Sequence, residues 1–239
     1  MNLILLQPDD FFAPDRVCLR GRRQQHIQQV HRANSGDRLR VGLEDGEIGT
    51  GEVVSLGTDT VELKVALDSP PPAALPLTLV LALPRPKVLK RVLQQVTAMG
   101  VKKLYLVNAY RVEKSYWQTP WLSTDKIGEQ CRLGLEQAVD TQMPHIETRK
   151  RFKPFVEDEL PGIAAATEKL VAHPVAARPC PVDSPRPTTL AVGPEGGFIP
   201  YEVEKLAEAG FSAVHLGPRI LRVETALPVL LGRLLPARG

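Results

Sequence analysis

Two segments near the C-terminal end of the chain combine residue types that could take part in binding and catalysis. The first, VGPEGGF at residues 192–198, follows directly on the apolar run Leu190–Val192. Glycines let a backbone approach a flat ligand closely and adopt dihedral angles that other residues avoid. The segment matches neither the Walker phosphate loop nor the GxGxxG dinucleotide fingerprint. A tight structural turn is the alternative interpretation of its composition.

The second segment, LGPRILRVETA at residues 216–226, carries two arginines, a glutamate and a threonine. We expect Thr225 to cap the helix that follows, which places Pro228 in the first turn, where its missing N–H is not needed. The alternative interpretation of Arg222 and Glu224 is a local ion pair at the start of that helix.

From residue 77 onwards the chain alternates between strands and helices, and these elements must position both segments. Apolar runs of strand length alternate with stretches in which apolar residues recur at helical spacing. This alternation predicts an α/β fold with a parallel sheet covered on both faces, which binds ligands at the carboxyl ends of its strands. The predicted strands are residues 77–83, 104–107, 170–172, 190–192 and 213–216, and the predicted helices are residues 88–99, 127–138, 200–209 and 224–235.

The chain before residue 70 has the pattern of a small β-barrel. Three successive prolines at residues 70–72 cannot lie inside a helix or a central strand and indicate an extended connector. We therefore predict a β-barrel domain at residues 1–69, a proline-rich linker at 70–76 and an α/β domain at 77–239. Within the barrel, the predicted strands are residues 3–6, 16–19, 39–43, 48–55 and 61–66, and the predicted helix is residues 21–33.

The overall composition excludes several classes of protein. The chain has 239 residues, of which 43% are hydrophobic and 24% charged, as in ordinary globular proteins. It has no run of about 18 apolar residues, and its apolar start is too short for a signal peptide, so we expect neither a membrane span nor secretion. The three cysteines are widely spaced, so we expect neither a disulfide framework nor a metal site. These features fit a cytoplasmic protein.

Basic residues are clustered, although the net charge is only +3. Seven arginines accompany a single acid between residues 16 and 40, and eight basic residues accompany a single acid between residues 85 and 114. Such clusters favour a polyanion as partner, because they neutralise the phosphates of RNA or DNA. The alternative is that both clusters are solvated faces.

The two C-terminal segments together resemble the SPOUT methyltransferases, and specifically the 16S rRNA uracil-N3 methyltransferase family (ribosomal RNA small subunit methyltransferase E). The motif pair GPEGG and LGPRILRVETA carries the resemblance. The stretch QQVT at residues 94–97, Gly100-Val101 and Glu136-Gln137 also match that family. In the N-terminal part, the family's small PUA-like RNA-binding barrel is matched by His26, Val30, Arg32, Gly36 and Asp37. The resemblance covers nearly the whole chain.

The resemblance implies a fold, a cofactor and a partner. The α/β domain is expected to be a parallel-sheet SPOUT domain with a deep trefoil knot that holds S-adenosyl-L-methionine, and the knots of two subunits are expected to pack together as a homodimer. The expected substrate is a uridine of 16S rRNA in the small ribosomal subunit. The implied cofactor-binding residues are Val107, Asn108, Gly193, Pro194, Glu195, Gly196, Gly197, Leu216, Gly217, Ile220, Leu221, Arg222, Thr225 and Ala226.

The resemblance also suggests roles for charged residues. Uracil N3 normally carries a proton that must leave before or during methyl transfer. We expect Arg222 to stabilise the developing uracil anion, with Glu195 or Glu224 orienting its side chain. No metal is implied. The residues expected to contact RNA are Arg16, Arg20, Arg22, Arg23, His26 and Arg32 in the barrel, and Lys87, Arg111 and Lys114 in the α/β domain.

The chain departs from the family pattern at Ala98, at Val139 and at Pro228. These departures affect the expected RNA contacts and the target nucleotide more than the class of reaction. Three alternatives stay open: a SPOUT methyltransferase that acts on a ribose 2′-oxygen or a purine nitrogen, an RNA-binding assembly factor without catalysis, and a sensor that binds the cofactor without transferring its methyl group.

Overall fold

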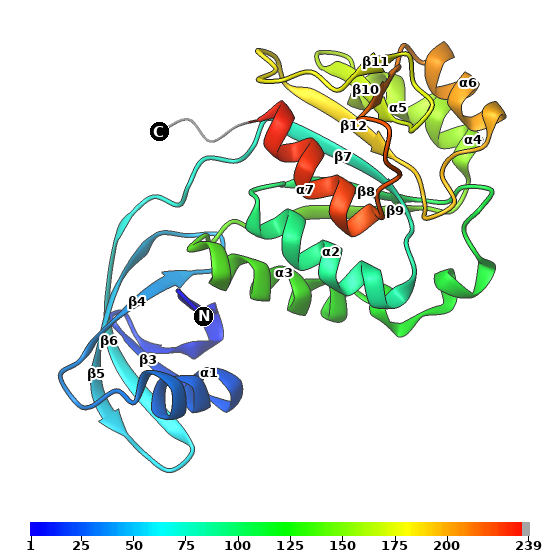
Figure 1. Ribbon diagram of the computed structural model, residues 1–239. Helices are drawn as coiled ribbons and strands as arrows, with labels where there is room; N and C mark the ends of the chain where they lie inside the picture. The colour runs from blue at the N-terminus through cyan, green and yellow to red at the C-terminus, as the bar shows by residue number, and fades with distance from the viewer. Residues whose placement is uncertain (236–239) are drawn as a thin grey trace. The chain divides into compact units, whose positions relative to one another are not determined.

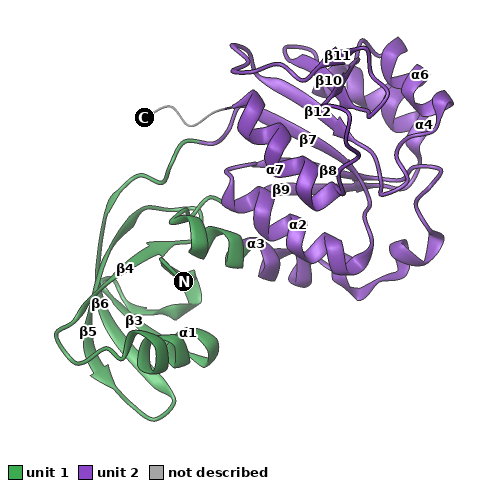
Figure 2. Ribbon diagram, viewed as in Figure 1, with its two compact units in different colours: residues 1–73, 132–143 green, residues 74–131, 144–239 purple. Residues whose placement is uncertain are grey.

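The computed structural model describes residues 1–235, which form two compact units. One unit combines residues 1–73 with residues 132–143, and the other combines residues 74–131 with the chain from residue 144 (Figure 2). The division runs through helix α3 (Thr124–Ala138). The sequence predicts residues 132–143 as part of the C-terminal domain, whereas in the structure they group with the N-terminal unit. The backbone explains this, because the amides of Asn2 and Leu3 both donate to the carbonyl of Glu136.

The N-terminal unit is built on a six-stranded sheet in the order β1-β4-β5-β6-β3-β2. All neighbouring strands are antiparallel except β1 and β4. Alternation along β6 explains its place in the sheet, since Val61, Leu63 and Val65 are buried while Lys64 is exposed. The strands are β1 (Ile4–Leu6), β2 (Phe11–Ala13), β3 (Arg16–Arg20), β4 (Arg38–Leu43), β5 (Ile48–Leu56) and β6 (Thr60–Ser69).

The helix predicted at residues 21–33 is present but is not regular along its length. It begins as α1 (Gly21–Gln25) and continues as a π-helical turn over His26–His31. Arg32 ends it in the left-handed conformation, with φ of 52°. Strand β2 and the short 3-10 turn Pro8–Asp10 were not predicted, because three residues are too few to show a period.

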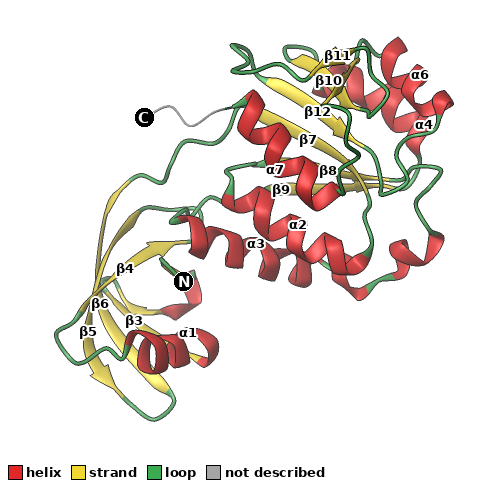
Figure 3. Cartoon of the chain, in the orientation of Figure 1, coloured by secondary structure: helices red, strands yellow, loops and turns green. Residues whose placement is uncertain are grey.

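The second unit contains a seven-stranded sheet in the order β11-β13-β10-β12-β7-β8-β9, in which all neighbouring strands are parallel. The predicted parallel sheet is therefore confirmed (Figure 3). Strands β7 and β12 are buried along their whole length, as expected of central parallel strands. The strands are β7 (Leu77–Ala82), β8 (Lys103–Val107), β9 (His145–Arg149), β10 (Glu168–Ala172), β11 (Arg178–Pro179), β12 (Thr188–Val192) and β13 (Ser212–His215).

Helices cover both faces of this sheet. Helices α2 (Pro86–Ala98) and α7 (Val223–Leu234) pack together on one face, and α4 (Phe152–Pro154), α5 (Leu160–Ile163) and α6 (Pro200–Glu208) lie on the other (Figure 1). The amphipathic pattern predicted for α2 is confirmed, since Val88, Leu89, Val92 and Leu93 are buried. Short 3-10 turns lie at Lys114–Gln118 and Pro120–Leu122, and a π-helical stretch, Phe155–Glu159, joins α4 to α5.

The strand order brings the two motif segments together. Strand β10 pairs with β12 on one side and with β13 on the other, so the carboxyl ends of these three strands lie at the same edge of the sheet. The GPEGG segment leaves β12 at that edge, and the LGPRILRVETA segment leaves β13 there. No helix within residues 1–235 is both long and apolar enough to cross a membrane.

Candidate active site

A cavity of about 260 Å³ opens at the carboxyl ends of β10, β12 and β13. Both motif segments contribute to its wall, as the sequence predicted. The predicted residues that line the cavity are Gly193, Pro194, Glu195, Gly196, Gly197, Leu216, Gly217, Ile220, Leu221 and Ala226. The residues that were not predicted are Ala172, His173, Pro174, Val192, Val214, His215, Arg219, Val223 and Leu230. Since several of these end the strands beneath the cavity, the carboxyl-end rule could have found them.

Glycine is required at particular positions of the cavity wall. A β-carbon on Gly193 would lie 2.9 Å from the backbone nitrogen of Phe198, closer than real side chains approach. Gly197 and Gly217 have φ angles of 73° and 107°, which other residues rarely adopt. At these positions the wall is therefore backbone rather than side chain, which suits close contact with a flat ligand.

Two arginines from neighbouring segments hold the GPEGG loop in place. The backbone N–H and the Nε–H of Arg85 both donate to Glu195 Oε1, at 3.1 and 3.3 Å. Arg111 donates from its guanidinium to the carbonyl oxygen of Gly196. Glu195 is thus paired with Arg85 at the start of α2. The expectation that Glu195 might orient Arg222 is not supported by this arrangement, because its carboxylate is directed to a different guanidinium.

A histidine fixes the backbone of the second loop. The N–H of Gly217 donates to His215 Nδ1 at 2.9 Å, so the neutral imidazole must carry its proton on Nε2. His173, at the end of β10, donates its backbone N–H to the carbonyl of Val214. Both histidines line the cavity. They place two imidazoles beside the glycine loops, which sequence reasoning did not anticipate.

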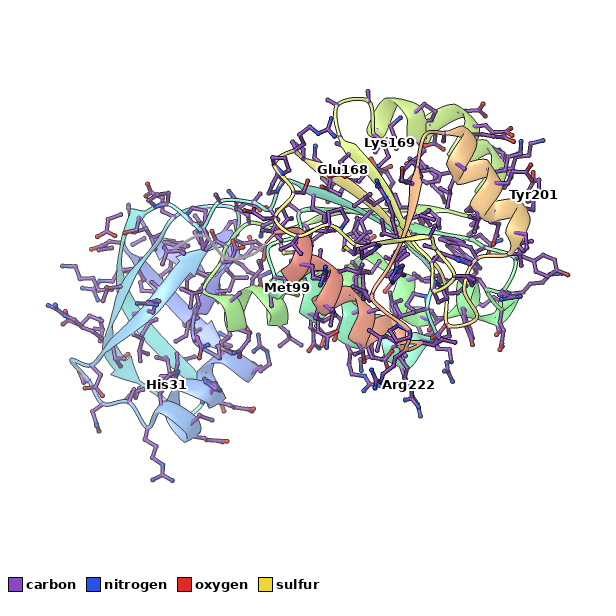
Figure 4. All side chains as sticks on the ribbon, turned by 45° about the horizontal axis from the view of Figure 1, so that its top comes forward. His31, Met99, Glu168, Lys169, Tyr201 and Arg222 are labelled. Atoms are coloured by element: carbon purple, nitrogen blue, oxygen red, sulfur yellow. The ribbon has the colours of Figure 1, made fainter. Side chains whose placement is uncertain are left out.

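Arg222 is the N-cap residue of α7, and it is exposed. Figure 4 shows it at the beginning of that helix. Its carbonyl accepts hydrogen bonds from the amides of Thr225 and Ala226, at 2.9 and 2.7 Å. No ion pair joins Arg222 to Glu224 among residues 1–235, so the simple local pair is not formed. Neither Arg222 nor Thr225 lines the cavity.

Two expectations about α7 were wrong. The helix begins at Val223, so Thr225 lies inside its first turn and does not cap it. Pro228 consequently lies in the helix interior and not in the first turn. The helix starts earlier because Val223, Leu227 and Leu230 all pack into the core, and burying these side chains outweighs one hydrogen bond lost at proline.

The structure places Val107 and Asn108 away from the cavity wall. Val107 is buried at the end of β8, which is separated from β12 by β7. The Asn108 side-chain oxygen accepts a hydrogen bond from Trp117 Nε1 at 2.8 Å. The backbone N–H of Asn108 donates to the carbonyl of Arg149. Both residues therefore shape the segment after β8, and neither lines the cavity.

The basic residues of the N-terminal unit fall into two groups. Arg23 donates to both carboxylate oxygens of Asp10, at 2.5 and 2.7 Å, and to the carbonyl of Leu5. Arg22 makes a two-pronged ion pair with the buried Glu136, at 2.7 and 2.8 Å. These two guanidinium groups are therefore bound within the unit. In contrast, Arg20 and Arg32 are exposed.

His26 and Arg16 are partly buried. Burial lowers the pKa of His26 below its ordinary value, and the positive charges of the N-terminus, His31 and Arg22 lower it further. The lowered pKa disfavours the charged form of this imidazole. In the second unit, the predicted RNA contacts Lys87, Arg111 and Lys114 are all exposed.

Comparison with known proteins identifies both units. A family model described as an RNA methyltransferase domain matches residues 71–235, and a model described as an RNA methyltransferase PUA domain matches residues 19–66. The predicted fold class, a PUA-like β domain followed by a parallel-sheet SPOUT domain, is thereby confirmed. The described residues contain no cluster of three or more His, Cys, Asp or Glu that could hold a metal ion.

Individual relatives resemble the chain over most of its length. Ribosomal RNA small subunit methyltransferase E of Treponema pallidum is 28% identical, over 95% of this chain and 87% of its own length. The protein of the same name from Bacillus subtilis is 28% identical over 86% and 84%.

Among solved structures, a ribosomal RNA small subunit methyltransferase E from Neisseria gonorrhoeae bound to S-adenosyl methionine has a TM-score of 0.74, with 21% identity over 97% of both chains. A methyltransferase from Legionella pneumophila in complex with SAM has a TM-score of 0.73, with 24% identity over 97% of both chains. Since the RNA methyltransferase model matches well over half of the residues, the chain belongs to this family of RNA methyltransferases, as its paired glycine and arginine motifs predicted.

Proposed function

We propose that this protein transfers a methyl group from S-adenosyl-L-methionine to N3 of a uridine in 16S rRNA of the small ribosomal subunit. The observation that carries the proposal is the single cavity formed jointly by the GPEGG and LGPRILRVETA loops at the carboxyl ends of three parallel strands. The names of the Treponema pallidum and Bacillus subtilis relatives supply the small-subunit rRNA as substrate class.

The residues of the cavity fit this cofactor. Gly193 lets the loop close on itself, because a β-carbon there would meet the backbone of Phe198, and Gly197 has a φ of 73° that favours glycine. The backbone of this loop suits contact with a flat adenine ring. Apolar side chains complete the wall, among them Leu216, Leu221 and Leu230. S-adenosyl-L-methionine supplies an already activated methyl group when bound, so the protein has mainly to align the nucleophile and exclude water.

Arg222 is the residue proposed to stabilise the uracil. Loss of the N3 proton leaves negative charge on the ring, and a cation beside it lowers the energy of that state. The position of Arg222 supports the role, since it is exposed at the N-terminus of α7, where unpaired backbone N–H groups also favour negative charge. Glu224 follows it in the first turn of α7 but makes no ion pair with it in the described part of the chain, so the proposal rests on Arg222 alone.

Exposed basic residues of each unit are proposed to contact RNA, namely Arg20 and Arg32 in one unit and Lys87, Arg111 and Lys114 in the other. Phosphate neutralisation by these groups makes the affinity strongly salt dependent. The protein is proposed to act in the cytoplasm as a homodimer joined through the SPOUT domain. Sedimentation of the purified protein tests the assembly state separately from activity.

The test is methylation of small ribosomal subunits and of naked 16S rRNA with isotopically labelled S-adenosyl-L-methionine, followed by mass spectrometry of nucleosides. Label recovered as N3-methyluridine is the expected result. Label on another nucleoside would retain the class of enzyme and refute the target atom. Absence of label in a protein that still binds the cofactor would contradict catalysis on this RNA and favour an RNA-binding role.

A further inference from the structure

Tyr110 is a large aromatic residue whose side chain is exposed to solvent. Its side chain belongs to the segment after β8, and the residue is 79% exposed. Single exposed apolar residues are common on protein surfaces, so exposure alone indicates nothing about function. Three features of the surrounding structure distinguish Tyr110 from an ordinary surface residue: a rigid backbone, a contact with the cavity wall through its neighbour, and a positively charged setting.

The backbone that carries Tyr110 is held by hydrogen bonds along its length. The N–H of Tyr110 donates to Glu202 Oε1 at 2.7 Å, and the other oxygen of Glu202 accepts from the N–H of Ile199 at 3.0 Å. Glu202 is only 3% exposed, so this anchor is part of the core of the unit. The Val112 N–H donates to the Ala109 carbonyl at 3.0 Å. A ring on so fixed a backbone loses little conformational entropy when it binds.

The segment adjoins the proposed cofactor cavity. Arg111, the next residue, donates to the carbonyl of Gly196, which lines the cavity. The two are packed so closely that a β-carbon on Gly196 would lie 2.9 Å from Arg111 Cδ. Tyr110 is therefore tied on one side to the start of α6 through Glu202 and on the other to the cavity wall through its neighbour.

The charge of this region favours an anionic partner. Arg111 is exposed and binds a neutral carbonyl, so no carboxylate neutralises its charge through that bond. Lys114 is also exposed on the same segment. The segment 108–114 thus contains two basic residues and the single acid Glu113. A nucleic acid satisfies both requirements of the site, since its phosphates match the charge and its bases match an exposed aromatic ring.

We infer that Tyr110 stacks on a nucleobase of the single-stranded RNA segment that carries the target uridine. Unpaired bases are commonly recognised by stacking on aromatic side chains, and every base offers a face for such contact. The inference rests on the proposed function for the identity of the substrate. Tyr110 acts in it as a contact for substrate binding and takes no part in methyl transfer itself.

The test compares Tyr110→Ala, Tyr110→Leu and Tyr110→Phe in steady-state methylation of small ribosomal subunits. Loss of stacking by one base should raise KM for the RNA by about fivefold to a hundredfold in the alanine and leucine variants. The phenylalanine variant should stay within about twofold of wild type, because it keeps the ring. Affinity for S-adenosyl-L-methionine and the melting temperature should not change in any of them.

Tyr201→Ala is the matched control. Tyr201 is a second exposed tyrosine of the same unit, 43% exposed, and its ring projects from α6 into solvent (Figure 4). We expect wild-type KM for this variant. An equal loss in Tyr110→Phe and Tyr110→Ala, a loss in Tyr201→Ala as large as that in Tyr110→Ala, or a wild-type KM for Tyr110→Ala would each overturn the inference.

A second measurement separates this inference from the proposed function. Small subunits containing 4-thiouridine are irradiated with the wild-type protein, and the cross-linked peptides are identified by mass spectrometry. A cross-link at Tyr110 supports stacking even if no N3-methyluridine is formed, in which case only the proposed reaction fails. Methylation by the wild-type protein with no cross-link at Tyr110 and no effect of Tyr110→Ala removes only the stacking role.

Discussion

A β-carbon on Gly193 would lie 2.9 Å from the backbone nitrogen of Phe198, and 3.2 Å from the backbone of Gly197. The contact is between backbone atoms, so no side chain can rotate to relieve it. The GPEGG loop therefore closes on itself so tightly that the first glycine after β12 leaves room for hydrogen only. This closure gives the cavity its backbone wall.

Gly193→Ala should accordingly impair cofactor binding. Relieving the clash requires a shift of the loop that costs about 1–3 kcal/mol, and the affinity for S-adenosyl-L-methionine should fall by about tenfold or more. Isothermal titration calorimetry measures the change. Gly162→Ala is the control, because nothing lies within 4 Å of a β-carbon at Gly162, on α5. Unchanged affinity in Gly193→Ala would show that the loop adapts and that its closure is not needed.

Arg222→Ala should reduce kcat with little change in cofactor affinity. Removing one group that stabilises charge in a transition state typically lowers the rate by about 10²–10³-fold. Arg222→Lys should retain part of the activity, since it keeps the charge but not the planar geometry. Initial rates with saturating RNA and cofactor measure this directly.

Arg186→Ala provides the reference for Arg222→Ala, because Arg186 is an exposed arginine between β10 and β12. We expect Arg186→Ala to have wild-type activity. Undiminished turnover in Arg222→Ala would remove Arg222 from the chemistry, whatever its position at the start of α7.

Arg23→Ala should lower the stability of the protein, whereas Arg20→Ala should weaken its binding to RNA. Arg23 and Asp10 have side chains only 16% and 11% exposed, so loss of Arg23 leaves a carboxylate largely buried and unpaired, which costs about 2–4 kcal/mol of stability. Arg20 is exposed, and Arg20→Ala should leave stability unchanged. It should instead weaken RNA binding and lower the salt dependence of log K by about one.

Urea unfolding and filter binding at several salt concentrations measure the two effects. Each variant is the control for the other, because both remove a single positive charge from the same unit. If Arg23→Ala were as stable as wild type and bound RNA more weakly, the ion pair with Asp10 would be incidental and Arg23 would belong to the RNA surface.

Glu147 should make a pH-dependent contribution to stability. Hydrogen bonds from Arg149 and from His145, at 2.7 and 2.8 Å, hold the pKa of this carboxyl below its usual range. A carboxyl whose pKa is lowered by folding stabilises the folded state above its unfolded pKa, and this contribution is lost as the pH falls through the folded pKa. The melting temperature of the wild type should therefore fall in acid partly through Glu147.

Glu147→Gln should make the melting temperature depend less on pH in the acidic range. The variant should be less stable than wild type at pH 7, and the difference between them should shrink as the pH falls below the ordinary range of a glutamate. Differential scanning fluorimetry from pH 3 to pH 7 measures the difference in melting temperature, because this window spans the ordinary pKa range of a glutamate. Glu204→Gln, at an exposed position of α6, should track the wild type. A constant difference between Glu147→Gln and wild type at all pH values would contradict the role of the charge.

Much of the fold was predictable because local sequence and buried environment agree. Strands β7 and β12 are short apolar runs between breaking residues, and only the centre of a parallel sheet buries both of their faces. Strand β9 was missed for the opposite reason. Its sequence, HIETR, is mostly polar, and it lies at the edge of the sheet, where Glu147 and Arg149 can pair in partly exposed positions.

The candidate site divides in the same way. The glycine and arginine motifs could be located from the sequence because each follows an apolar run that predicts a strand. Residues of both segments line the cavity. Val107 and Asn108, which were predicted to bind the cofactor, do not line the cavity, because β7 separates β8 from β12, and no local pattern encodes the order of strands. The partners of Glu195 and Arg23 were likewise unpredicted.

The sequence by itself determined the class of fold and the two loops that form the cavity, because these depend on hydrophobic period, on glycine and on residues close together along the chain. The family followed from the resemblance of the motif pair GPEGG and LGPRILRVETA to known methyltransferases. Only the tertiary structure decided which charges are bound and which are free. Arg23 meets Asp10, Arg85 meets Glu195 and Tyr110 is anchored by Glu202 across separations of up to 110 residues. Such pairings follow from the packing of strands and helices, and no local propensity specifies them.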